Sequence, residues 1–270
     1  MKQVARLQGA LACIVPILIS SCVYPSNAEI EANQNLLNLF AKTGLRVCVQ
    51  SCDLRIKVGS QTVTGLAAER EGPEGLAFVT QRLYDELSLY PRELFQKTKS
   101  DTLVLCRALA INGGLRAVIP DLRTGTLYID CDEITLLDSE YFSRYLHHEV
   151  FHLIDCRSNS DLTRNAAWMA ANPAEFKYQA MKSVEGEGAL DLEVPGFLSR
   201  YSRTAVNEDM AELFSFMIVY PDLVIKRSKV DSVLDKKVKL IKSQIAQVCP
   251  AMSAEYWVKH ERCQSVRWMR

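Results

Sequence analysis

The sequence has 270 residues, of which 48% are hydrophobic, so it is long enough to bury the core of a single domain. Lysine and arginine together number 32, as do aspartate and glutamate, and this balance gives no electrostatic reason to expect a nucleic-acid partner. The short basic runs at 226–229 and 236–237 are therefore interpreted as solvated helix faces.

Residues 1–21 have the pattern of an export signal. Two basic residues precede an apolar run at 7–19, which is too short to span a bilayer as a mature helix. The letters Ile-Ser-Ser-Cys at 19–22 resemble a bacterial lipobox, and cleavage there would leave Cys22 as a lipidated N-terminus. The alternative is an ordinary secretory signal cleaved near Ala28. Both predict export, and the lipobox predicts a bacterial cell-envelope lipoprotein anchored in the membrane by its lipid.

Nine cysteines are consistent with an oxidising compartment. Cys13 would leave with the signal and Cys22 would carry lipid, so an odd number would remain and at least one thiol should be unpaired. Spacing suggests two short-loop disulfides, one within 48–52 and one within 249–263.

After a polar tether at 22–30, the chain is interpreted as one domain over 31–270, with an α/β part at 31–135 and a helical part at 136–270. In the α/β part, periodicity and turn residues predict a helix that ends at Gly44, a strand at 54–58, a turn at 71–75, a helix at 76–87 that Pro91 interrupts, and strands at 102–106, 116–119 and 126–130.

The helical part is expected to contain helices at 139–156, 207–220 and 230–248, with a long loop within 157–200. The last helix carries an apolar stripe that includes Leu234 and Ile241. We expect this stripe to pack against the domain, the alternative being a coiled-coil partner face.

The helix at 139–156 carries the pattern His-Glu-x-x-His at 148–152. His148 and His152 are four residues apart, so both imidazoles can reach one metal ion. Such ligands leave zinc an open position, where a bound water has its pKa lowered toward neutrality. Glu149 would then act as the general base and later deliver the proton to the leaving amine.

The alternative is a helix that carries these residues by chance. Three of the four histidines fall at 147, 148 and 152 among apolar neighbours, and buried imidazoles need partners or a metal. His147 points about a quarter turn away from His148 and is expected to pack or to support the site. His260 lies in a polar tail and is expected at the surface.

A third ligand must come from elsewhere, because Asp155 and Ser158 stand where the long metzincin pattern needs Gly and His. Glu208 and Glu212 share a face of the helix predicted at 207–220. One would bind zinc, and the other would orient a histidine or hold the first in place. The alternative is an acidic first turn that favours a helix N-terminus.

Residues 141–220 resemble the zinc-binding metallopeptidases found as bacterial lipoproteins and, more distantly, the gluzincin-like catalytic domains of the anthrax lethal factor type and of secreted Pro-Pro endopeptidases. The matching pieces are 147–155, Trp168, Asn172-Pro173, Phe176, Tyr178, 196–201 and 208–212. In those peptidases the first glutamate of Glu-x-x-Ala-Glu binds zinc, which maps onto Glu208 and leaves Glu212 as support. The resemblance also implies a tyrosine seven residues earlier, where this chain has Tyr201.

Two further roles follow as hypotheses. The hydroxyl of Tyr201 would donate to the oxyanion of a tetrahedral intermediate, or its ring would simply pack at the mouth of a loop. Asp155 would accept a hydrogen bond from a ligand imidazole, or it would be a surface carboxylate.

The expected fold is a mixed α/β (α+β), zincin-like domain, with a small twisted mixed sheet near 102–131 against the metal-binding helix. Its edge strand, assigned to 126–130, would pair with an extended peptide or protein substrate. The expected activity is peptide-bond hydrolysis with one zinc ion per chain. The rivals are a catalytically silent zinc lipoprotein that acts as a binding or assembly factor, a zinc hydrolase of a non-peptide amide, and a metal-free structural protein.

Overall fold

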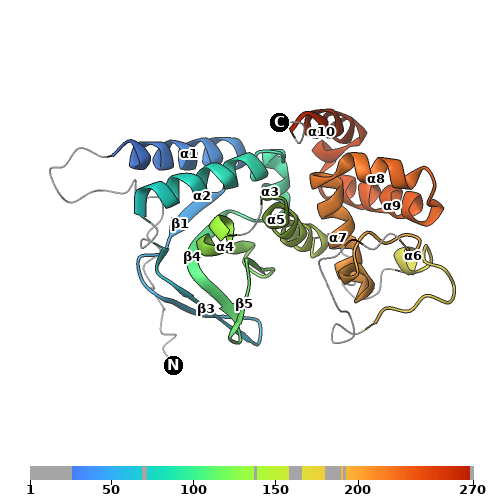
Figure 1. Cartoon of the computed structure of the whole chain (residues 1–270), viewed down its shortest axis with the longest axis horizontal. Coiled ribbons are helices and arrows are strands. Elements are labelled where there is room, and N and C mark those ends of the chain that lie inside the picture. The colour runs from blue at the N-terminus through green and yellow to red at the C-terminus, as the bar shows by residue number, and fades with distance from the viewer. Residues whose placement is uncertain are drawn as a thin grey trace, which may run out of the picture.

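The computed structural model describes residues 26–68, 72–136, 139–157, 166–179, 190 and 193–267 (Figure 1). The export signal, Cys22 and much of the loop predicted within 157–200 lie outside these ranges. Among the described helices, none combines the length and the apolar character that crossing a membrane requires.

The chain alternates helices and strands in its first half and is helical in its second half. The helices are α1 (Asn27–Thr43), α2 (Gly72–Leu87), α3 (Arg92–Thr98), α4 (Cys131–Leu136), α5 (Ser139–Asp155), α6 (Ala166–Met169), α7 (Val206–Val219), α8 (Pro221–Ser228), α9 (Ser232–Val248) and α10 (Ala254–Arg267), with 3-10 helices η3 (Tyr201–Arg203) and η4 (Pro250–Met252). The strands are β1 (Arg46–Val49), β2 (Leu54–Val58), β3 (Gln61–Leu66), β4 (Thr102–Ile111), β5 (Gly114–Leu115), β6 (Val118–Asp121) and β7 (Thr126–Asp130).

These elements confirm the expected mixed α/β class. In Figure 1 the sheet lies with α1 and α2 on one side of the molecule, α7 to α9 lie on the other, and α5 lies between them. The stripe on α9 packs inward as expected, because Leu234, Ile241 and Ile245 are buried in the main core.

The sheet is organised around β4. The first half of β4 pairs in parallel with β1 and β7, and its second half pairs antiparallel with β3 and β5. Between the halves, Ala108 has a positive φ of 47°. There the amides of Ala108 and Leu109 donate to the carboxylates of Asp132 and Asp130, at 3.2 and 2.7 Å. Side chains thus satisfy backbone groups where the strand changes partners.

The expected edge strand is wrong. β7 lies inside the sheet, between β4 and β6, and β6 ends the sheet order. The run at 126–130 is too well buried for an edge, because Leu127 and Ile129 are both in the core. β6 also packs against α5, which places the true edge beside the metal-binding helix.

The tether is shorter than expected, because α1 begins at Asn27. Ser26 caps the helix: its hydroxyl accepts from the amide of Glu29, and the Glu29 carboxylate accepts from the amide of Ser26. This capping box provides partners for free amides at the helix N-terminus, and Gly44 in the left-handed conformation ends the helix as predicted. The turn expected at 71–75 is likewise displaced, because α2 begins at Gly72.

The disulfide expected within 48–52 does not form. Cys48 is buried on β1 and Cys52 is exposed after the strand, and no disulfide joins the two. Cys249 is a free thiol, and the side chain of its expected partner Cys263 lies outside the described residues.

Candidate metal centre

Two long helices bring the candidate ligands together. α5 is buried along Phe142, Leu146 and Val150, so its histidines are held against the core. α7 is apolar on nearly every side and is enclosed by other helices. These two helices pack directly on each other, so polar groups on their facing sides must find partners at their interface.

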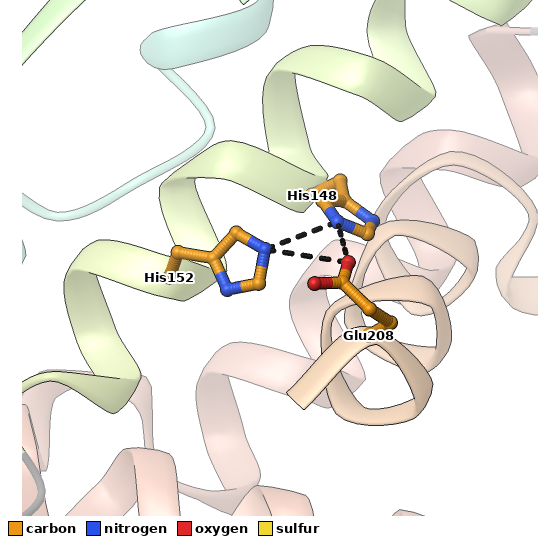
Figure 2. A group of neighbouring side chains, drawn as sticks. All are labelled: His148, His152 and Glu208. Carbon is orange, nitrogen blue, oxygen red and sulfur yellow. Dashed lines mark hydrogen bonds and ion pairs between the residues drawn. The ribbon is translucent and has the colours of Figure 1, made fainter. Parts of the chain in front are cut away.

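Three ligand atoms converge at that interface (Figure 2). The Nε2 atoms of His148 and His152 are 3.1 Å apart. Glu208 Oε2 lies 2.9 Å from Nε2 of His148 and 3.6 Å from Nε2 of His152. Zinc bonds to nitrogen and oxygen are about 2.0–2.2 Å long, so neighbouring ligands of a tetrahedral ion lie about 3.3–3.5 Å apart. The three separations bracket that value, and the group fits a zinc ion.

Glu212 fixes the orientation of His148. Its Oε1 lies 3.0 Å from Nδ1 of His148, while its Oε2 accepts from Arg144 at 2.9 Å and from the Ser199 hydroxyl at 2.5 Å. An ionised carboxylate only accepts hydrogen bonds, so Nδ1 of His148 must be the donor. A neutral ring then has its proton on Nδ1 and a lone pair on Nε2, the nitrogen that faces Glu208. Metal binding through Nε2 requires this tautomer.

The charges confirm how closely these groups are coupled. Burial lowers the pKa of His148, but hydrogen bonds to Glu208 and Glu212 outweigh it and raise that pKa to about 10. Burial likewise opposes ionisation of Glu208, yet the two histidines hold its pKa well below the ordinary range. The two carboxylates therefore favour a cation between them, either a proton on His148 or a metal ion.

Glu149 is half-buried on α5 between the two histidines. Burial raises its pKa and the nearby charge of Glu208 adds to this, whereas His152, His148 and Arg116 act in the opposite direction. The net effect is a pKa above the ordinary value for a glutamate, which moves this carboxyl toward the range useful for proton transfer near neutral pH.

Tyr201 lies over the same group of residues. Its ring centroid is 5.7 Å from that of His148. Burial raises the pKa of its hydroxyl, as do the charge of Glu208 and a hydrogen bond to it, so the phenol stays protonated and can donate. The turn that carries Tyr201 is fixed by Ser199, whose hydroxyl accepts from the amide of Ser202 at 3.2 Å and donates to Glu212.

The other two histidines have structural partners. His147 is fully buried, with Nδ1 2.7 Å from the Tyr90 hydroxyl and Nε2 3.1 Å from Glu86, in keeping with the expected packing role. The surface position expected for His260 is wrong, because its ring is buried and Nε2 lies 2.9 Å from the carbonyl of Ile218. Asp155 is buried and accepts from Gln244 at 2.7 Å, so its bond to a ligand imidazole stays a prediction.

A second polar cluster adjoins the first and was missed from the sequence. Asp209, next to Glu208, accepts from Lys237, Trp168 and Tyr178 at 2.7, 2.7 and 2.8 Å. Lys237 is fully buried, so its expected place on a solvated face is wrong. The spacing of Lys237 could have predicted its burial, because it lies three residues after Leu234, on the side of α9 that packs inward.

Lys237 joins the segments of this cluster. Its ammonium also donates to the carbonyl of Gly196 at 3.0 Å and lies 3.6 Å from the ring centroid of Phe197. Gly196 begins the segment that leads to Tyr201, and its amide donates to Asp231 at 2.7 Å. The cluster thus ties the start of α7 to the segment that carries Tyr201.

Comparison with known proteins adds evidence on the fold. No protein-family model matches the chain, and no curated protein sequence matches it. Among solved structures, the chain is similar to a "putative zinc-binding metallo-peptidase" from Bacteroides caccae, with 13% sequence identity and a TM-score of 0.51. The likeness covers 90% of this chain and 96% of that one. It shows a shared fold and leaves the chemistry to be argued from the site.

Proposed function

We propose that this chain is a zinc-dependent peptidase anchored at the bacterial cell envelope. The observation that carries the proposal is the convergence of His148, His152 and Glu208 at separations suited to a tetrahedral ion, with Glu149 on the same helix. The fold shared with the structure from Bacteroides caccae supports it.

His148, His152 and Glu208 would hold the ion, and Glu212 would keep His148 in the binding tautomer. Zinc held there would supply Lewis acidity to the attacking water and to the substrate carbonyl. Glu149 takes the proton of the attacking water and delivers it to the leaving amine, which its raised pKa favours. The Tyr201 hydroxyl donates to the oxygen on which negative charge develops.

An extended substrate would pair with β6, the end strand beside α5. The amide of Asp130 donates to the carbonyl of Ala117 at 2.9 Å, so residues 117, 119 and 121 bond to β7. In an antiparallel pair, alternate residues bond to the neighbouring strand. The backbone N–H and C=O groups of Val118 and Pro120 therefore point away from β7, toward the open edge. Because proline has no N–H, this edge offers one donor and two acceptors, which favours a short segment of bound peptide.

The anchor is proposed from the sequence alone. The charged start, the apolar run at 7–19 and the lipobox-like letters at 19–22 support export and lipidation at Cys22. A lipid attached there would hold the catalytic domain at the surface of the membrane.

The test measures metal content and hydrolysis in the same preparations. Purified chain should carry about one zinc, and both His148→Ala and Glu208→Ala should lose it. Glu149→Gln should keep the zinc and lose cleavage of a peptide library, and Tyr201→Phe should keep the zinc and lose about 10²–10³-fold in kcat.

Two outcomes would replace the proposal. A folded chain that binds no zinc after reconstitution would leave a structural protein. A chain that binds zinc but cleaves no peptide would favour the binding factor, or the hydrolase of a non-peptide amide if an amide library is cleaved instead.

A further inference from the structure

The outer face of α1 carries three large apolar side chains. The inner face packs on α2 through Ala32, Asn35, Leu39 and Thr43, two of which are polar. The outer face has Ile30, Leu37 and Phe40, which are 53%, 58% and 39% exposed. A helix on the surface of a domain normally turns its large apolar side chains toward the core, so three of them exposed on one side are suited to apolar cover.

Few charges interrupt this face. The charged side chains exposed on α1 are Glu31 and Lys42, near its two ends. Beyond its C-terminal end, the exposed Arg92 lies over the ring of Phe40, with its guanidinium carbon 6.0 Å from the ring centroid. The uncharged Gln34 and Asn38 lie beside the three apolar side chains and bond to each other at 2.9 Å. An uncharged, partly apolar face with Lys42 and Arg92 at one end matches the boundary of a bilayer that contains anionic headgroups.

The position of α1 in the chain favours a lipid surface over other cover. Five Cα steps separate Cys22 from Asn27, and a fully extended chain of that length reaches about 17 Å at most. A lipid on Cys22 would therefore keep the start of α1 close to the headgroups. Figure 1 shows α1 on the outer side of α2, at the end of the molecule away from α7.

We propose that the outer face of α1, made by Ile30, Leu37 and Phe40, lies flat in the membrane interface and orients the anchored domain. This inference rests on the proposed lipid anchor at Cys22. A lipid anchor alone leaves the domain free to tumble, and a second apolar contact fixes its orientation. The interface of α5 and α7 lies nearer the middle of the molecule and α1 takes no part in it, so α1 on the membrane would leave that interface uncovered for envelope peptides.

The test uses the full chain, expressed with its own leader in a bacterial host and placed in phosphatidylethanolamine and phosphatidylglycerol vesicles. Leu37→Trp reports on α1, and Leu115→Trp is the control, because Leu115 is 61% exposed on β5. Brominated lipids quench tryptophan that enters the bilayer. We expect Leu37→Trp to lose most of its added emission and Leu115→Trp to keep it, after subtraction of the unsubstituted chain.

The outcomes separate the two proposals. The intact mass reports lipid on Cys22 independently, and a chain without lipid that stays in solution overturns both the anchor and the orientation. A lipidated, vesicle-bound chain in which Leu37→Trp and Leu115→Trp are quenched equally overturns the orientation alone. A dimer in detergent that Leu37→Glu dissociates would also overturn it, because a second copy would then cover α1.

Discussion

The buried ammonium of Lys237 is the most informative group to remove outside the metal site. Lys237→Met keeps the length and apolar contacts of the side chain but leaves the Asp209 carboxylate without its cation. Both groups are almost completely buried, so water cannot replace the lost partner.

The expected loss follows from that burial. Breaking a buried ion pair from one side costs about 3–5 kcal/mol of unfolding free energy, because a charge is left uncompensated. Trp168 and Tyr178 still donate to Asp209, which holds the loss toward the lower end. The lost hydrogen bond to the carbonyl of Gly196 adds about 1 kcal/mol.

Urea unfolding followed by circular dichroism measures this loss, with a chelator present so that zinc binding does not contribute. The double variant Lys237→Met with Asp209→Asn is the matched control. It removes both charges while keeping an acceptor for Trp168 and Tyr178, so it should be more stable than Lys237→Met alone. A loss below about 1 kcal/mol, or a double variant no more stable than the single one, would refute the reasoning.

Three further predictions concern the zinc site, the sheet and one turn. Glu212→Gln removes the charge that holds Nδ1 of His148, so zinc affinity in chelator competition should fall about 10–100-fold, and an unchanged affinity would contradict the role of Glu212. Burial raises the pKa of Asp130 to about 6 from 3.8, so the folded state holds this proton more tightly than the unfolded state. The contribution of Asp130 to the free energy of unfolding should therefore fall as pH rises from 3.8 to 6. In urea titrations over this range, Asp130→Asn should remove that contribution, and an unchanged pH dependence would contradict the role of Asp130. Gly125→Ala would place a Cβ 2.3 Å from the carbonyl oxygen of Lys99, whereas Gly59→Ala meets nothing within 4 Å at a similar positive φ, so calorimetry should show a larger drop in Tm for Gly125→Ala.

The sequence predicted the elements that have strong local signals. The strands at 54–58 and 126–130 and the helix over 139–155 appear at or within one residue of their expected bounds. Each has a clear period and punctuation at its ends, so local preference and tertiary packing agree. The convergence of His148, His152 and Glu208 in the structure follows the same logic, because spacing on two helices fixed which side chains could meet.

What the sequence did not predict depends on contacts between distant segments. Strand order is one case. Residues 126–130 were expected at the edge, but β7 pairs with both β4 and β6, and the residues of β7 alone do not indicate its neighbours. His260 is another, since its burial depends on the carbonyl of Ile218 coming to meet its ring. Composition suggested an exposed tail, and tertiary contact overrode it.

The burial of Lys237 also gives a structural role to three aromatic residues. In the sequence, Trp168, Tyr178 and Phe197 had no chemical role beyond their place in the resemblance. In the structure, Trp168 and Tyr178 donate to Asp209, and the ring of Phe197 faces the ammonium of Lys237. An ammonium without exposure needs acceptors and aromatic faces on all sides, and these residues provide them. These three aromatic residues therefore form a buried support for the start of α7, with Asp209 one residue from Glu208.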